Sequence, residues 1–286
     1  MLRTVIPRVY GTDTGDDTVD VAAYMTAYSA TISFTLDGET AAPIDDVQTW
    51  LKCDSTGRSL QQAAGITTLA DVIANSDVLG YLMSDESAMK YLARSTGFAE
   101  EGCASETFMT ALGASSWVDD TVLNSDIWVE KICNSQYMDK VLNDLIPAMT
   151  SNTSPVGTAY VLPNSNDYLP YKMFDKDSTT FSGTTQYASY PHYYGMNFNS
   201  NKMICAINIP ILGNNGYPPK DCILQVSDDG SNWRDIKQFI IDNTSGANNL
   251  IVFSQVSTKY IRIKANNGYY TNYNWSGIFE WYIYGR

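Results

Sequence analysis

The sequence predicts a multi-domain α+β protein, in which a mixed and short-helix repeat region precedes a C-terminal β-sandwich of the jelly-roll type. Charge and aromatic content both change near residue 150. Residues 1–150 carry 22 acidic and 8 basic side chains, whereas residues 151–286 carry 9 acidic and 10 basic ones and 14 of the 20 tyrosines. We therefore expect an N-terminal anchoring or assembly region at 1–67, a short-helix decad-repeat region at 68–149 and a β-sandwich at 150–286.

Composition also bounds the partners and the compartment. The acidic front half lacks the Lys/Arg clusters that phosphate contacts need, so we expect no nucleic-acid partner. No apolar run approaches the roughly 20 residues of a membrane span, and the N-terminus lacks the apolar core of a secretory signal. The five cysteines are odd in number and show no metal-like spacing, which favours reduced thiols. The sequence leaves open whether Cys205 and Cys222 form a disulfide.

Residues 68–145 repeat a short pattern that ends in serine. The interval between successive serines is ten residues from Ser95 to Ser135, the earlier unit ends at Ser76, and the Ser84 unit is one residue out of step. Each serine is expected to cap the next short helix, and large apolar residues follow two or three positions later. These are Phe108, Trp117, Trp128 and Met138. Helices this short must stack on one another or on copies of the chain.

Serine- and asparagine-capped decad arrays of this kind resemble those of bacteriophage virion and tail proteins. The resemblance implies a structural element that contacts other virion proteins and its own copies in a homo-oligomer, for which a trimer is one candidate. The alternative is an ordinary small helical domain with coincidental spacing.

The back half reads as short strands between Gly, Asn and Pro turns. The strands are expected at 156–162, 202–212, 221–227, 236–242, 249–254, 258–264 and 277–285. In the last of these, large apolar residues alternate with Glu280 and two tyrosines, as in a half-buried strand. This spacing is typical of a β-sandwich.

Four motifs in this half occur in a recognisable order. They are the loop FDKDSTTF at 174–181, the turn SDDGSNW at 227–233, KYIRI at 259–263 and the closing strand IFEWYIYG at 278–285. In this order they resemble the discoidin family, also called coagulation-factor (F5/8) type C domains, which are galactose-binding-like and similar to carbohydrate-binding modules. The resemblance implies an eight-stranded jelly-roll sandwich that binds glycans or other surfaces.

The same resemblance implies one structural calcium ion. Position by position, side-chain oxygens would come from Asp175, Thr180 and Glu280, and carbonyl oxygens from Lys172, Asp177, Thr180 and Phe279. Six to eight hard oxygens are what calcium requires. The sequence departs from the family pattern at Lys176, which replaces a glycine whose backbone can need a positive φ. The alternative is a site without metal, in which Glu280 bonds to the loop backbone.

Ligand residues cannot be carried over from the family, because its binding loops vary. Two loops have suitable chemistry for sugars, namely aromatic rings together with amide and polar groups. The candidate residues are Tyr190, His192, Tyr193, Tyr194, Tyr269, Tyr270, Tyr273 and Trp275. The alternative is that these aromatics pack the loops down or meet a neighbouring subunit.

No catalytic motif accompanies these features, and the single histidine, His192, has no nucleophile or acid motif beside it. We expect no enzyme. The leading hypothesis is a bacteriophage virion protein, made in the host cytoplasm and located in the tail, collar or head as a fibre or adhesin that binds a host-surface glycan. The alternatives are a purely structural decoration or spacer, and a glycan-active enzyme with an appended binding module.

Overall fold

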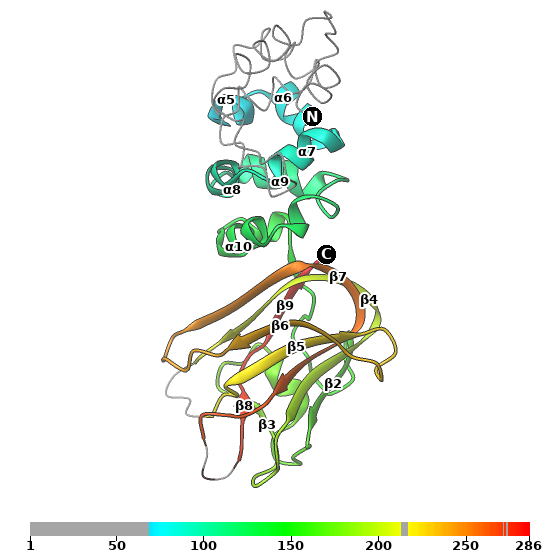
Figure 1. Cartoon of the computed structure of the whole chain (residues 1–286), viewed down its shortest axis with the longest axis vertical. Helices are drawn as coiled ribbons and strands as arrows, with labels where there is room; N and C mark the ends of the chain where they lie inside the picture. The colour runs from blue at the N-terminus through cyan, green and yellow to red at the C-terminus, as the bar shows by residue number, and fades with distance from the viewer. Residues whose placement is uncertain (1–68, 213–216, 271, 273) are drawn as a thin grey trace, which may run out of the picture. The chain divides into compact units, whose positions relative to one another are not determined.

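The computed structural model describes residues 69–212, 217–270, 272 and 274–286 (Figure 1). The expected region 1–67 and Tyr273 lie outside these residues. The chain divides into a helical unit that ends at Lys140 and a β unit that begins at Val141 and includes Ile132–Asn134. The expected boundary at 150 therefore falls inside the β unit, because residues 143–149 already pair with and pack into the sandwich.

Short helices make up the helical unit. Those with α geometry are α5 (Leu69–Ala74), α6 (Ser76–Ser84), α7 (Glu86–Leu92), α8 (Thr96–Gly102), α9 (Glu106–Ala114) and α10 (Asp126–Asn134). Two 3₁₀ turns, η1 (Val122–Asn124) and η2 (Met138–Lys140), complete the series. None of the described helices is long and apolar enough to cross a membrane.

Helix caps recur every ten residues. The Oγ atoms of Ser95 and Ser105 accept hydrogen bonds from the backbone N–H groups three residues on, at 3.1 and 3.3 Å. Asn75 and Asp85 do the same through Oδ1, at 3.1 and 2.8 Å. Each bond satisfies one of the free N–H groups of a helix start.

The position of the first two caps corrects the expected register. Ser76 is the first residue of α6 and Ser84 is its last, so neither caps a helix start. The capping positions are Asn75 and Asp85, and the interval of ten therefore runs unbroken from 75 to 105. Serine spacing alone missed this because Asn and Asp supply an equivalent acceptor oxygen.

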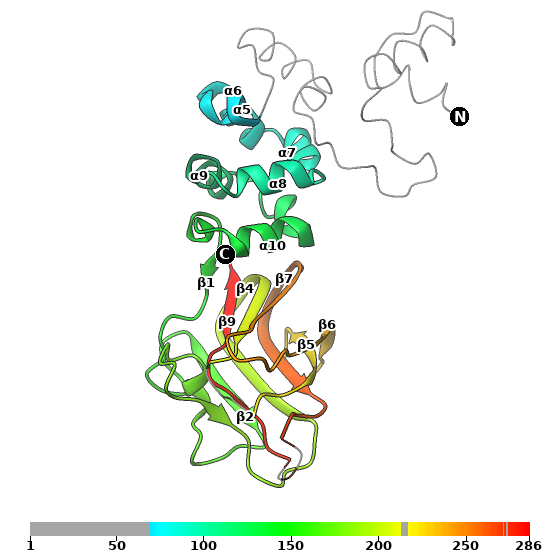
Figure 2. The ribbon, with the colours of Figure 1, turned by 90° about the vertical axis from the view of Figure 1, so that its left-hand side faces the viewer.

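Burial follows the same interval. Side chains that are at most 2% exposed occur at Val78, Phe98, Phe108 and Trp128. A second buried series has an interval of ten from residue 72 to residue 132, and its members are Val72, Leu82, Leu92, Gly102, Leu112, Val122 and Ile132. Segments about three decads apart also lie side by side, as α5 with α8 and α6 with α9. The Trp128 Nε1–H donates to the Leu92 carbonyl at 3.1 Å. The helices accordingly lie in successive layers (Figures 1 and 2).

The β unit consists of antiparallel strands. They are β1 (Asn143–Asp144), β2 (Gly157–Leu162), β3 (Ser182–Gly183), β4 (His192–Pro210), β5 (Asp221–Ser227), β6 (Arg234–Ile240), β7 (Asn248–Ala265), β8 (Gly277–Ile278) and β9 (Tyr282–Gly285). The larger sheet has the order β1-β9-β4-β7-β5-β6, with β2 added beside β4, and β3 pairs with β8 in a second, two-stranded sheet.

Two long strands organise this unit. Strand β4 pairs with β2 through its first half and with β9 through its second half, and it pairs with β7 along most of its length. Register shifts interrupt the β4–β7 ladder at two places, where the strands bend (Figures 1 and 2). The two expected strands at 249–254 and 258–264 are therefore one strand, and β4 starts ten residues earlier than expected.

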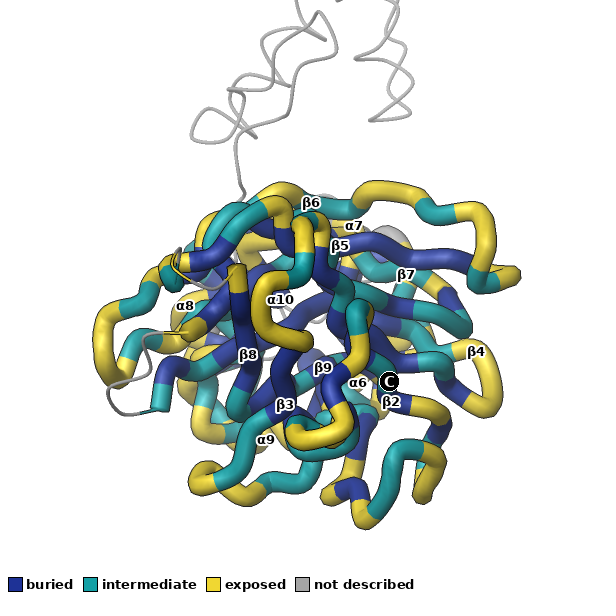
Figure 3. Tube along the Cα trace, turned by 90° about the horizontal axis from the view of Figure 1, so that it is seen from below, coloured by how far each residue is buried: buried dark blue, intermediate teal, exposed yellow. Residues whose placement is uncertain are grey.

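The core of the β unit lies on the inward face of these strands. It includes Tyr194, Met196 and Phe198 from β4 together with Ile261 and Ile263 from β7, all fully buried. Figure 3 shows buried positions along the strands, while exposed positions gather in the connecting loops. The alternation of inward and outward residues follows from the two-residue period of a strand.

Candidate functional site

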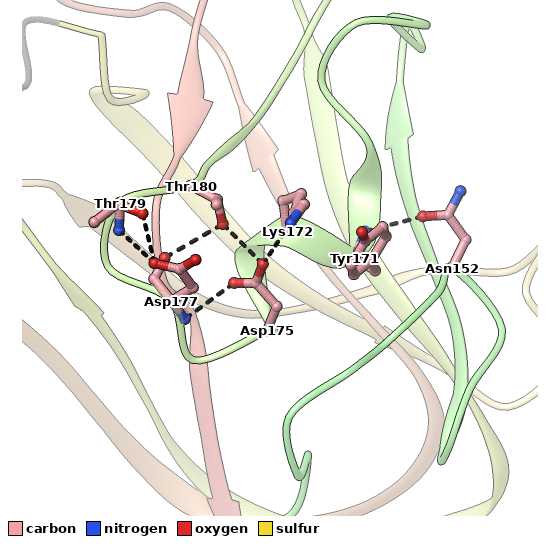
Figure 4. Close-up of polar contacts among 7 residues, drawn as sticks. All are labelled: Asn152, Tyr171, Lys172, Asp175, Asp177, Thr179 and Thr180. Carbon is pink, nitrogen blue, oxygen red and sulfur yellow. Dashed lines mark hydrogen bonds and ion pairs between the residues drawn. The ribbon is translucent and has the colours of Figure 1, made fainter.

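The loop between η3 (Pro170–Met173) and β3 is organised around one carboxylate. Asp175 Oδ2 accepts hydrogen bonds from Lys172 Nζ at 3.1 Å and from Thr180 Oγ1 at 2.8 Å, and its Oδ1 accepts from the Asp177 N–H at 3.1 Å (Figure 4). Asp175 therefore brings Lys172, Asp177 and Thr180 together in one loop, and whether these residues bind calcium stays a prediction.

A second carboxylate stabilises the turn of this loop. Asp177 Oδ1 accepts from both the N–H and the hydroxyl of Thr179, at 3.0 and 2.6 Å (Figure 4). These bonds lower the pKa of Asp177 below its ordinary value. The carbonyl of Asp177 accepts from the Thr180 N–H at 3.0 Å, so the expected carbonyl ligand faces back into the loop.

Glu280, which follows β8, is the most unusual group near this loop. It is 1% exposed, and neither carboxylate oxygen has a side-chain or backbone hydrogen bond of normal geometry among the described residues. Burial raises its pKa to about 7, partly offset by the ammonium of Lys176, and the Asp175 carboxylate adds to the rise. Lys176 is the favourable neighbour of this carboxylate, through its ammonium and a backbone N–H contact that also lowers the pKa. A buried carboxylate with so little compensation is costly, so a cation or a proton at this position would stabilise it.

Lys176 occupies the position where the family pattern has glycine. Its φ is +61°, so the lysine adopts the left-handed backbone that the loop requires. Its ammonium lies 2.5 Å from Asp144 Oδ2 and 4.2 Å from the centre of the Tyr282 ring. The substitution thus keeps the loop conformation and places the side chain on the neighbouring strands β1 and β9.

The residues of this loop fit a calcium ion. Asp175, Thr180 and Glu280 supply hard oxygens, and the orphaned Glu280 carboxylate is the feature that a cation would explain. Only two carboxylates take part, and no cluster of three or more His, Cys, Asp or Glu side chains suited to a metal occurs in the described part of the chain. Carbonyl oxygens of Lys172, Asp177 and Phe279 would have to complete the shell.

The first aromatic loop differs from its prediction. His192 and Tyr194 are fully buried, because strand β4 begins at His192 and turns both side chains inward. His192 Nδ1 and the Tyr194 hydroxyl both hydrogen-bond to Ser276 Oγ, at 2.9 and 2.7 Å. In this conformation neither residue has surface for a ligand, and the prediction that they bind one is wrong.

Trp275 is also removed from the surface, at 5% exposure. Its ring packs against Tyr168 and against Tyr217, with centroid distances of 5.3 and 4.5 Å, and Tyr217 in turn packs edge-on against Tyr270 at 5.1 Å. Trp275 is therefore the centre of an aromatic cluster that holds several loops together. Within this cluster Tyr217 stays accessible, with 39% exposure.

The remaining candidates lie at or near the surface. Tyr190 stacks on His192 at 3.9 Å, and Tyr193 lies beside the guanidinium of Arg262. Tyr269 is 36% exposed, and its hydroxyl donates to the Ile241 carbonyl at 2.6 Å, which fixes the ring.

Two accessible residues near the candidate loops were not among the predicted ligand residues. Tyr187 is 68% exposed and Ile240 is 66% exposed. An open hollow of about 430 Å³ lies where β5 begins and β6 ends, and it is lined by Gln238, Ile240 and Asn266 among others. No sequence signal marked Ile240, since an apolar residue in a strand usually indicates core.

The turn at 227–233 is structural. Gly230 has a φ of +75°, and the Asp229 carboxylate accepts hydrogen bonds from the backbone N–H groups of Ser231 and Asn232 at 2.8 and 2.7 Å. These bonds hold the pKa of Asp229 well below its usual range. The Trp233 Nε1–H donates to the Gly230 carbonyl at 3.2 Å, so the motif closes on itself.

None of the described cysteines, Cys103, Cys133, Cys205 and Cys222, forms a disulfide, so the Cys205–Cys222 bond left open by the sequence is not formed. Cys53 lies outside the described residues.

Comparison with known families agrees with this architecture. Residues 149–281 match the F5/8 type C domain. The β unit is an F5/8 type C, discoidin-like domain. No curated protein matches the chain.

Several solved structures are similar to this part of the chain. One is CpGH89CBM32-5 from Clostridium perfringens, in complex with GalNAc-β-1,3-galactose, with 20% identity over 44% of this chain and 93% of that chain and a TM-score of 0.39. Another is CBM32-3 from a family 31 glycoside hydrolase of the same organism, with 16% identity, 47% and 94% coverage and a TM-score of 0.42. A third is chitosan-binding module 1 of a chitosanase/glucanase from Paenibacillus sp. IK-5, with 21% identity, 47% and 98% coverage and a TM-score of 0.39.

Proposed function

We propose that this chain is a bacteriophage virion structural protein, a fibre or adhesin of the tail, collar or head, whose F5/8 type C domain binds a host-surface glycan. The single observation that carries the glycan-binding part is the match of residues 149–281 to that domain. A domain of this fold can serve many ligands, so the binding surface has to be argued from its own side chains.

Accessible aromatic rings support a sugar ligand. Tyr187, Tyr217 and Tyr269 present ring surface, and the hollow near Tyr269 adds the amides of Gln238 and Asn266 beside exposed Ile240. Rings of this kind pack on the apolar face of a pyranose, while amides bond its hydroxyls. We place the glycan on these loops, with His192, Tyr194 and Trp275 holding them in position.

The virion part of the proposal rests on the helical unit. Its caps recur every ten residues and its helices have nine residues or fewer, too short to be stable alone. Segments that need neighbours to bury their apolar faces suit an array or an oligomer. Copies of the chain held together would also add avidity to a weakly binding module.

A purely structural role is the second candidate. It is favoured by the packing of Trp275 with Tyr168 and Tyr217, since a cluster of rings can equally form the edge of a protein interface. The chain would then be a decoration or spacer without a glycan ligand. We further propose that the chain is not an enzyme, and the only histidine, His192, is buried with its pKa lowered by that burial.

A glycan array with the full chain, in calcium and in chelator, tests the adhesin proposal. We expect binding to at least one bacterial surface glycan, and a loss of binding in Tyr269→Ala. Uniform silence in both conditions would favour the structural role. Hydrolysis of any host polysaccharide by the pure chain would instead support the enzyme alternative.

Mass spectrometry of purified phage particles tests the virion proposal. We expect the chain among the structural proteins, in a copy number that reflects a symmetric position. Its absence from particles of a phage that expresses it would contradict the proposal and leave the glycan result unaffected.

A further inference from the structure

One row of outward-facing residues crosses five strands of the larger sheet. The register pairs Tyr160 of β2 with Gly195 of β4, Gly195 with Arg262 of β7, Arg262 with Gln225 of β5, and Gln225 with Asp235 of β6. Directly paired residues lie on the same face of a sheet. The core residues that flank the row in β4 and β7 point the other way, so the row lies on the face opposite to the core.

Arg262 is held rigidly at the middle of this row. Its Cζ lies 3.7 Å from the ring centre of Trp233 and 4.3 Å from that of Tyr193, and its Nε–H donates to Gln225 Oε1 at 2.7 Å. The amide of Gln225 in turn donates to Asp235 Oδ1 at 2.6 Å. Among the described residues the guanidinium has no other hydrogen bond, so its two terminal nitrogens keep their donors.

A glycine makes the surface beside Arg262 flat. A Cβ atom at Gly195 would overlap the ring of Tyr160, so this ring covers the backbone of β4. The tyrosine and the two rings that stack on Arg262 form an aromatic surface around one fixed guanidinium. Aromatic surface with a single oriented polar group is what a pyranose ring requires.

The neighbouring row continues the same surface. Leu162 pairs with Tyr193, Tyr193 with Lys264, Lys264 with Ile223, and Ile223 with Gln238. Leu162 is 48% exposed at one end of this row, and Ile223 and Gln238 line the open hollow of about 430 Å³ at the other. The two rows therefore lead from an exposed apolar residue to an accessible depression.

The charges on these rows select an acidic ligand. Arg262 and Lys264 are basic. Asp235 in the first row accepts a hydrogen bond from Gln225, and Asp221, which lines the hollow, accepts one from the amide of Asn267. A planar guanidinium with two free donors matches a carboxylate in a bidentate pair. A neutral sugar offers only uncharged hydroxyl oxygens to these donors, and these form weaker hydrogen bonds than a carboxylate does.

We propose that this sheet face, centred on Arg262, binds an acidic polysaccharide through the carboxylate of a hexuronate residue. The carboxylate accepts from the terminal nitrogens of Arg262, and neighbouring sugars of the chain pack on Tyr160 and toward the hollow. The site is separate from the loops proposed above, so the two can fail independently.

Calorimetric titration of the full chain tests the proposal, with galacturonate and glucuronate oligosaccharides as probes and their methyl esters as neutral counterparts. We expect at least one uronate to bind and to weaken with added salt, and its ester to bind at least roughly tenfold more weakly. Arg262→Lys keeps the charge and removes the planar fork, so it should lose roughly tenfold in affinity.

A pair of surface variants distinguishes loss of the binding face from loss of folding. Leu162→Glu places a negative charge on the proposed face and should abolish uronate binding, whereas Leu169→Glu changes a leucine of similar exposure, 42%, in another segment and should not. Tyr269→Ala should leave uronate binding unchanged. The proposal is overturned if no uronate binds, if esters bind as well as acids, or if Leu162→Glu and Arg262→Lys both bind as the native chain does.

Discussion

The helical unit and the β unit use their residues in different ways. In the helical unit a cap and its partner are three residues apart, and burial repeats every ten positions. In the β unit the decisive contacts join residues far apart in the sequence, such as Tyr194 with Ser276 and Arg262 with Gln225. A local sequence pattern therefore predicts the helix starts of the first unit. In the second unit, the side chains of a site come together only when strands far apart in the sequence pair.

Removing a core tryptophan from each unit should have the largest effect. Trp128 and Trp281 are both fully buried, and Trp281 packs against Phe174 at 5.3 Å. Truncation to alanine should cost about 3–5 kcal/mol in either case. If the units unfold separately, denaturation followed by circular dichroism will show each variant shifting one transition. A shift of both transitions by one variant would show that the units are coupled.

Addition of calcium should stabilise the β unit, with Glu280 as the residue on which the effect depends. Ion at about 100 times its Kd adds about 2.7 kcal/mol to the free energy of unfolding. Glu280→Gln should abolish this increase while remaining at least as stable as the native chain in chelator, because a neutral amide costs less to bury than an unpaired charge.

Thermal melts in calcium and in chelator measure this effect. Asp167→Asn is the control, since Asp167 is an exposed acid outside the loop. Equal calcium shifts in the native chain and in Glu280→Gln would refute the site.

The same substitution, glycine to alanine, should have opposite signs in the two units. At Gly80, inside α6, an added Cβ meets no atom within 4 Å, so Gly80→Ala should stabilise by about 0.5–1 kcal/mol. At Gly157 the added Cβ would overlap the backbone carbonyl of Asn197, and Gly157→Ala should destabilise by about 1–3 kcal/mol. Urea titrations of both variants would detect the contrast, and a shared sign would contradict it.

Neighbouring residues test the register of the caps. Asn75→Ala removes the acceptor for the Val78 N–H and should cost about 1 kcal/mol. Ser76→Ala changes an exposed position within α6 and should be close to neutral. Chemical denaturation of the two variants separates these outcomes, and a larger loss in Ser76→Ala would restore the register suggested by serine spacing.

Protonation of His192 should make a destabilising contribution to the β unit as the pH falls. Burial lowers the pKa of its imidazole in the folded state, so the unfolded chain binds the proton more readily. The stability is fully present above the unfolded-state pKa near 6.5 and is lost as the pH falls toward the lower folded-state value. Glu280, with its pKa raised to about 7, contributes in the opposite direction over this range, because its protonation favours the folded state. The Glu280→Gln variant removes that contribution, so melting temperatures at pH 7.5 and 5.5 should differ less in the double variant with His192→Gln than in Glu280→Gln alone.

Sequence motifs located much of the fold and less of the site. The serine interval predicted helix caps at Ser95 and Ser105, whereas the Asp175 loop was predicted only as a set of calcium ligands, and its hydrogen bonds were not. The serine interval does not indicate the caps Asn75 and Asp85, because their acceptor oxygens belong to other residue types. His192 and Tyr194 were assigned to a binding loop because a short aromatic stretch does not indicate whether it forms a loop or the start of a buried strand.

The sequence by itself determined the helix caps at Ser95 and Ser105 and how the Asp229–Gly230 turn closes, because these depend on residues a few positions apart. It also indicated the domain family of the back half, through four motifs in a recognisable order. Only the tertiary structure decided that His192 is a core residue, that Glu280 is buried beside Lys176, and that Arg262 lies between two rings. Each of these depends on strand register across the sheet, and register is set by the packing of the whole core.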